Sequence, residues 1–150
     1  MSNIREYLKN HILYLDGGMG SLLQERGLKP GELPERWNRD HPDHIVDIQK
    51  MYYDVGSNVV LTNTFGANCL KFDDDELDEL VCDAIDNANR AKELSCGTQE
   101  KFVALDIGPM GKLLEPYGDM PFDDAVDVYA KTIKFGHGKH RDPPDPQRSQ

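Results

Sequence analysis

Three short apolar runs, each followed by polar side chains and glycine, constrain the fold of this chain more than any other feature. They cover residues 12–15, 59–61 and 102–107. Runs of consecutive apolar residues are typical of strands that are covered on both faces, as in parallel sheets. Segments with helical spacing separate the runs at a repeat of roughly 40 residues, which predicts right-handed strand–helix–strand crossovers and an α/β fold.

Apolar residues at three- and four-residue spacing predict the helices of this pattern. The predicted helices cover residues 4–10, 21–26, 42–55 and 73–96, and a segment that starts at 121 or 122. Four acidic residues at 73–76 suit the positive end of a helix, so they are interpreted as a helix start rather than a cation site. Residues 29–39 contain two prolines and a glycine and are expected to form an ordered loop, which Trp37 attaches to the body of the protein.

Composition excludes several classes of function. The 150 residues suit one domain, and the net charge of -10 argues against a nucleic acid or an anionic membrane as partner. No apolar stretch approaches the roughly 20 residues of a membrane span, and the first residues lack the apolar core of a signal peptide. Cys69, Cys82 and Cys96 contain no Cys-x-x-Cys pair. They predict reduced thiols in the cytoplasm rather than a zinc site.

Residues 135–150 differ in character from the rest of the chain. They lack apolar periodicity and contain Pro143, Pro144 and Pro146 among mostly polar residues. Such a segment buries too little apolar surface to offset the entropy of ordering it. The sequence therefore predicts one folded domain over residues 1–134 and a disordered tail over residues 135–150.

The end of the first apolar run carries the first candidate site. Asp16 is followed by Gly17 and Gly18, where bare backbone allows a ligand to come close. The carboxylate suits the ammonium group of a ligand, and it equally suits the backbone N–H groups of the next turn; spacing alone does not decide. The glycine spacing matches neither the dinucleotide fingerprint nor the phosphate-binding P-loop.

The second and third runs also end in polar groups. Thr62, Asn63 and Thr64 follow the second run, and Phe65 is placed to form an apolar wall. These groups either line a ligand pocket or satisfy loop backbone. Asp106 lies within the third run and is expected at the mouth of the sheet or beside a partner, because a buried unpaired carboxylate is costly. The carboxyl ends of parallel strands are where α/β folds bind ligands.

Taken together, residues 15–21, 61–68 and 106–111 resemble the homocysteine S-methyltransferase family. The likeness is strongest to the N-terminal homocysteine-binding module of cobalamin-dependent methionine synthases. It implies a partial (β/α)8 TIM barrel with about three N-terminal βα units. It also implies methyl transfer to the thiolate of homocysteine, which zinc binds and activates, with methylcobalamin in other modules as the methyl donor.

The resemblance assigns roles to six positions. Asp16, Gly17 and Gly18 would hold the amino-acid end of homocysteine. Asn63, Thr64 and Phe65 would line the same pocket. The family's zinc ligands are cysteines on later strands, including an adjacent pair, and this chain has no Cys-Cys pair. No catalytic residue and no metal ligand is therefore assigned.

The expectation is a truncated, inactive fragment of such a methyltransferase, with homocysteine as its ligand. Its remaining barrel or cobalamin modules would come from another chain. Two alternatives stay open: a small α/β protein that binds an anion at the Asp16 turn, and a non-catalytic interaction protein built on a barrel remnant.

Overall fold

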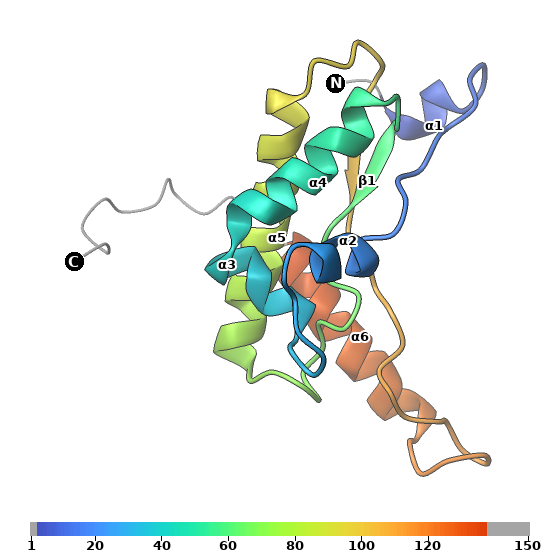
Figure 1. Cartoon of the computed structure of the whole chain (residues 1–150). Helices are drawn as coiled ribbons and strands as arrows, with labels where there is room; N and C mark the ends of the chain where they lie inside the picture. The colour runs from blue at the N-terminus through green and yellow to red at the C-terminus, as the bar shows by residue number, and fades with distance from the viewer. Residues whose placement is uncertain (1–2, 138–150) are drawn as a thin grey trace.

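A parallel β-sheet covered by helices forms the centre of the protein, which is described over residues 3–137 by a computed structural model (Figure 1). Strands β1 (Val59–Leu61) and β2 (Phe102–Ala104) pair in parallel. The predicted second strand is confirmed at both ends, because its residues pair with β2 and two of the three are buried. The register pairs Val59 with Phe102, Val60 with Val103 and Leu61 with Ala104.

The first predicted strand, residues 12–15, is reduced to a single parallel bridge between Leu15 and Val59. The backbone N–H groups of Asn58 and Val59 donate to the carbonyl of Tyr14, so this segment still runs along β1. Its side chains are not covered: Ile12 is 72% exposed and Tyr14 60%. The prediction of a full strand was wrong because only one end of the segment meets β1.

A helix forms at each of the five predicted places. The long helices are α4 (Pro42–Asp54) and α5 (Asp74–Leu94), which contact the sheet, and α6 (Phe122–His137), which packs on α5; the short ones are α1 (Ile4–Tyr7) and α2 (Gly20–Glu25). The acidic run is confirmed as the start of α5, where the side chain of Asp73 accepts a hydrogen bond from the N–H of Glu76 at 2.8 Å.

The segment expected as a loop at residues 29–39 contains two helical pieces. A 3-10 helix, η1 (Pro34–Arg36), runs directly into α3 (Trp37–Asp40). Proline at the first helical position fixes the backbone in a helical conformation, which the loop prediction overlooked. Trp37 is buried against Leu23, Ile45 and their neighbours, so it attaches this segment to α2 and α4.

The core lies between the sheet and the layer of α4 and α5. Val60 of β1 packs with Tyr53 of α4 and Ala91 of α5. A second cluster joins α5 to Leu105, just after β2, and to Phe135 of α6. Because Phe135 packs there, α6 continues to His137, three residues past the expected domain limit at 134. The rest of the predicted tail lies outside the described residues.

Strand β2 ends at Ala104, whereas residues 102–107 were predicted as strand. The N–H of Thr62 donates to the carbonyl of Ala104, and this is the last ladder bond. Beyond it, threonine side chains replace the backbone: Thr62 Oγ1 accepts from the N–H of Asp106 at 3.0 Å. Among the described helices, none is both long and apolar enough to cross a membrane.

Candidate functional site

The carboxylate of Asp16 lies at the end of β1. Its Oδ2 atom accepts the backbone N–H of Leu61 at 2.8 Å, while its own N–H donates to the carbonyl of Val59 at 3.0 Å. Burial raises the pKa of this half-buried carboxyl group, the hydrogen bond from Leu61 opposes that shift, and the nearby carboxylate of Asp106 adds to it. Asp16 therefore caps the neighbouring strand rather than the turn that follows it.

Tyr52 of α4 holds the glycine turn. Its hydroxyl donates to the carbonyl of Gly18 at 2.9 Å. A Cβ atom on Gly17 would lie 2.8 Å from that hydroxyl oxygen, closer than side chains approach in proteins. Glycine at this position thus allows Tyr52 to pack over the turn, which brings the exposed backbone of residues 17–18 beside Asp16.

The hydroxyl groups of Thr62 and Thr64 join the ends of β1 and β2. The two oxygens lie 2.7 Å apart, and Thr64 Oγ1 donates to the carbonyl of Asp106 at 2.7 Å. Thr64 is almost fully buried. Its hydroxyl fixes the position of Asp106 instead of facing a pocket, so it serves the backbone, as one of the sequence alternatives proposed.

Asn63 and Phe65 face different surroundings. The Nδ2 group of buried Asn63 donates to the carbonyl of Pro34 at 2.7 Å, which ties the turn to η1. Phe65 is 60% exposed, and its carbonyl accepts the N–H of Gly108 at 3.0 Å. The structure therefore leaves the ring of Phe65 accessible as a wall, whereas the Nδ2 group of Asn63 is used within the protein.

Two residues that the sequence analysis did not identify form hydrogen bonds to the same turn. Glu35 of η1 accepts the N–H of Gly66 through Oε1 at 2.6 Å. Asn38 of α3 donates from Nδ2 to the carbonyl of Asn63 at 2.8 Å. Both side chains are buried. Their only signal in the sequence is that they flank the single tryptophan inside an apparent loop.

Asp106 is the second carboxylate near this edge of the sheet. Burial raises the pKa of its carboxyl group, and the hydrogen bond from the N–H of Ile107 opposes the shift. Within residues 3–137, neither Asp16 nor Asp106 forms an ion pair with lysine, arginine or histidine. Two half-buried carboxylates of like charge attract a cation, so an ammonium group suits this edge better than an anion does.

The cysteines do not form a metal site in this part of the chain. Over the described residues, no three His, Cys, Asp or Glu side chains gather closely enough to hold an ion. Cys69 and Cys82 are partly buried, whereas Cys96 is exposed. The residues that the structure describes therefore do not fit a zinc centre.

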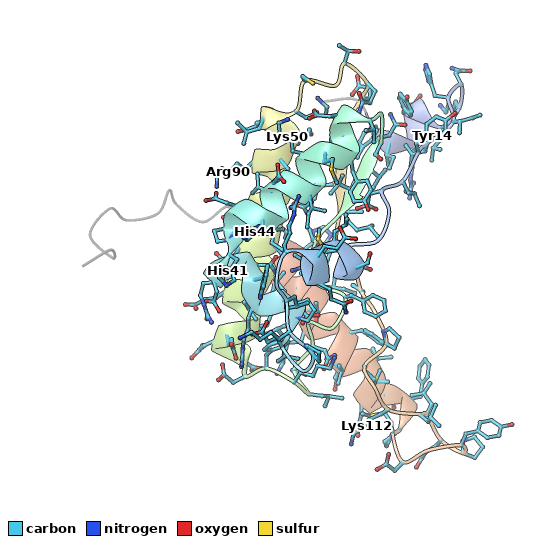
Figure 2. The ribbon with its side chains drawn as sticks, in the orientation of Figure 1. Tyr14, His41, His44, Lys50, Arg90 and Lys112 are labelled. Carbon is cyan, nitrogen blue, oxygen red and sulfur yellow. The ribbon has the colours of Figure 1, made fainter. Side chains whose placement is uncertain are left out.

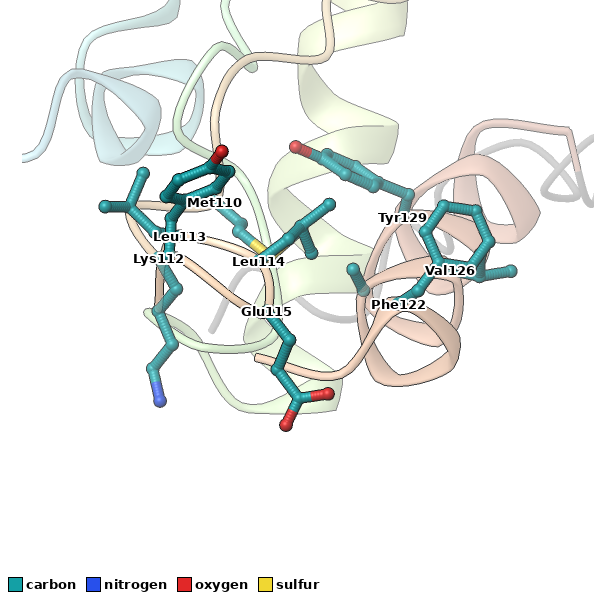
Figure 3. Close-up of a pocket in the computed structure, with 10 residues that line it drawn as sticks. Met110, Lys112, Leu113, Leu114, Glu115, Phe122, Val126 and Tyr129 are labelled. Carbon is teal, nitrogen blue, oxygen red and sulfur yellow. The ribbon is translucent and has the colours of Figure 1, made fainter. Parts of the chain in front are cut away.

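A separate hollow lies between the loop after β2 and α6 (Figure 3). It has a volume of about 760 Å³ and an aliphatic and aromatic lining that includes Leu114, Phe122 and Tyr129. Figure 3 shows Lys112 and Glu115 extending away from Tyr129. None of the six predicted site residues lines this hollow. Figure 2 places Lys112 at the opposite end of the molecule from Tyr14, which precedes the Asp16 turn.

Comparison with known proteins identifies the family to which this chain is similar. A profile described as homocysteine S-methyltransferase matches residues 13–142. A methionine synthase from Mycobacterium leprae is 28% identical over 144 residues, which cover 87% of this chain and 12% of that protein. The chain thus spans only a small part of that curated relative.

Solved structures show the same fold. The homocysteine methyltransferase MmuM from Escherichia coli in its oxidized form is 18% identical, with a TM-score of 0.75 over 89% of this chain and 52% of that one. Its metallated form gives a TM-score of 0.74 at 18% identity, with 88% and 52% covered. The chain spans about half the length of these enzymes. It belongs, by the extent of the profile match, to the homocysteine S-methyltransferase family.

Proposed function

We propose that this chain provides the part of a homocysteine S-methyltransferase barrel that binds the amino-acid end of homocysteine. The observation that carries the proposal is the acidic edge formed by Asp16 and Asp106 beside the exposed glycine turn. Membership of the family supplies the substrate class. In this proposal the strands and helices form the first βα units of a (β/α)8 barrel, in which loops at the carboxyl ends of the strands bind the ligand.

Each group has a distinct task in this proposal. The carboxylate of Asp16 accepts the substrate's ammonium group while it keeps its bond to the N–H of Leu61. The backbone of Gly17 and Gly18 is exposed on the side away from Tyr52, so in this proposal it approaches the substrate closely. The exposed ring of Phe65 borders the aliphatic part of the amino acid. Thr64 and Asn63 hold the turn that carries this ring.

Methyl transfer itself needs further groups. In the family, zinc lowers the pKa of the homocysteine thiol so that the thiolate takes the methyl group from the donor. The described residues do not form such a centre, so we assign this chain no step in thiol activation. That the 150-residue chain alone is inactive stays a prediction, as do its cytoplasmic location, methylcobalamin as donor, and the supply of further modules by another chain.

Titration with L-homocysteine tests the proposal. We expect saturable heat in isothermal titration calorimetry of the full chain, and at least a tenfold loss of affinity in Asp16→Ala, because the ammonium group loses its ionic partner. Asp43→Ala is the matched control, since Asp43 is exposed and pairs with Arg90 on the outer helical layer. Equal affinity in wild type and Asp16→Ala, or no binding by wild type, contradicts the proposal.

Thermal unfolding in the presence of inorganic phosphate or homocysteine tests the alternative that the chain binds an anion. Two carboxylates at this edge disfavour an anion, so inorganic phosphate should not raise the melting temperature. Stabilisation by phosphate without any effect of homocysteine would favour the alternative.

A further inference from the structure

A single short segment, η1 and the start of α3, makes three hydrogen bonds to the turn after β1. Glu35 accepts the N–H of Gly66, Asn38 donates to the carbonyl of Asn63, and the carbonyl of Pro34 accepts from the side chain of Asn63. These partners are 25 to 31 residues apart in the sequence. We call Pro34, Glu35 and Asn38 the clasp.

The burial of the Glu35 side chain at this position is energetically unfavourable. Its side chain is only 4% exposed, and the Oε2 atom is buried with no hydrogen-bond partner among the described residues. Asn38 is 1% exposed and likewise has a buried, unpartnered Oδ1 atom. An unsatisfied buried polar group lowers the stability of the folded protein. An apolar residue would avoid this cost but would leave the buried N–H of Gly66 without an acceptor, so the position of Glu35 is tied to that one N–H group.

The clasp acts on more than one strand end. The Gly66 N–H that Glu35 holds belongs to the peptide group whose carbonyl is that of Phe65. That carbonyl accepts the N–H of Gly108 at 3.0 Å. The contact is so close that a Cβ atom on Gly108 would lie 2.3 Å from the Phe65 oxygen. The carboxylate of Glu35 therefore orients one peptide group whose two ends connect η1 with the turn after β2.

We infer that Glu35 is a positioning residue for substrate recognition, which sets the Phe65–Gly66 peptide and thereby the ring of Phe65 and the 106–108 turn around the amino-acid ligand. This inference rests on the proposed function. Glu35 itself does not touch the ligand; it acts through the Gly66 N–H. The carboxylate is the strongest acceptor available for a backbone N–H, and the bond at 2.6 Å is short.

Three variants of the full chain test the inference. Glu35→Ala removes the acceptor, and we expect the dissociation constant for L-homocysteine to rise at least tenfold. Glu35→Gln keeps an oxygen acceptor of the same reach and should bind within about threefold of wild type. Arg36→Ala is the matched control, because Arg36 lies on the same 3-10 helix and pairs with Glu76 without contacting the turn.

A spectroscopic signal separates positioning from general stability. In ¹H–¹⁵N correlation spectra, Glu35→Ala should move the Gly66 and Gly108 amide signals, and Glu35→Gln should return the Gly108 signal to within its line width of wild type. Homocysteine should shift the same two signals in wild type. If Glu35→Ala does not fold, Glu35→Asp, which withdraws the acceptor by one methylene group, provides the same test.

The outcomes are distinct. Unchanged affinity in Glu35→Ala, or an equal loss in Arg36→Ala, overturns this inference while the proposed function stands. A wild-type chain that does not bind homocysteine overturns the proposed function, and the inference with it.

Discussion

Asp16 and Leu61 are joined by a bond in which a side-chain oxygen takes the place of a strand partner: Oδ2 of Asp16 accepts the N–H of Leu61 at 2.8 Å. The segment before Asp16 pairs with β1 through one bridge only. The carboxylate thus continues the hydrogen bonding along β1 beyond the last backbone bridge of this segment. The sheet itself therefore holds in place the carboxylate that we propose as a ligand-binding group.

Asp16→Asn should stabilise the protein at neutral pH. Burial raises the pKa of this carboxyl group above the ordinary 3.8, so the folded state holds the proton more tightly than the unfolded state does. Stability therefore falls as pH rises from 3.8 through the folded-state pKa, and stays lower above it. Asparagine avoids this loss and keeps an oxygen for Leu61. Thermal unfolding should show a higher melting temperature for the variant at neutral pH, and the difference should shrink as pH falls through the folded-state pKa towards 3.8. A variant that is less stable at neutral pH contradicts this reasoning.

Asp54→Asn should change stability in the opposite direction, by destabilising the protein at neutral pH. The Lys50 ammonium group, with the hydroxyl of Ser95, holds the pKa of the Asp54 carboxyl well below its ordinary 3.8. The stabilisation is present above pH 3.8 and is lost as pH falls through the folded-state pKa. The variant should melt at a lower temperature than wild type at neutral pH and converge with it in acid. Asp119→Asn, which removes one negative charge at an exposed loop position, is the control.

Gly17→Ala and Gly20→Ala should change stability in opposite directions. A Cβ atom on Gly17 would displace the Tyr52 hydroxyl from the carbonyl of Gly18, which costs about 1 kcal/mol for the lost hydrogen bond. Nothing lies within 4 Å of a Cβ atom on Gly20, the first residue of α2. Alanine there should add about 0.5–1 kcal/mol through its helix propensity. Urea unfolding of both variants checks the signs, and the same sign in both would be inconsistent with the described packing.

Thr62→Val should destabilise the protein by about 1–3 kcal/mol, because the N–H of Asp106 loses its acceptor at a part-buried position. Valine matches threonine in shape, so the change tests the hydroxyl group rather than the volume. Thr98→Val, at an exposed position, should stay within about 0.5 kcal/mol of wild type. Urea unfolding measures both changes, and equal effects of the two substitutions would show that the Thr62 hydroxyl does not hold the turn.

Local pattern predicted the elements whose burial follows from their own residues. Strand β1 consists of consecutive β-branched and apolar residues, and it lies between β2 and the segment that ends at Leu15. Both of its ends were predicted correctly. Helix α5 has an acidic start and a continuous apolar face, and it begins one residue after the predicted start and ends two residues before the predicted end. In both cases the sequence itself contains the periodicity and the end signals.

The rest depends on contacts between distant segments. The hydroxyl of Thr62 replaces a backbone partner, so β2 ends three residues before the apolar run does. Asn63 was predicted either to line a pocket or to satisfy loop backbone, and only the folded structure shows that its Nδ2 group donates to the carbonyl of Pro34, 29 residues away. Nothing near Glu35 in the sequence indicates that it holds Gly66. Such assignments come only from the folded arrangement of η1 against the turn after β1.

Strand β2 pairs with β1 and with no other strand among the residues described. Its far side therefore presents a row of amide and carbonyl groups that extended backbone of any origin can join. A polypeptide strand added there in parallel would widen the sheet by one strand and continue its twist. An exposed strand edge of this kind can also pair with another copy of the same molecule, which makes it a liability for aggregation at high protein concentration.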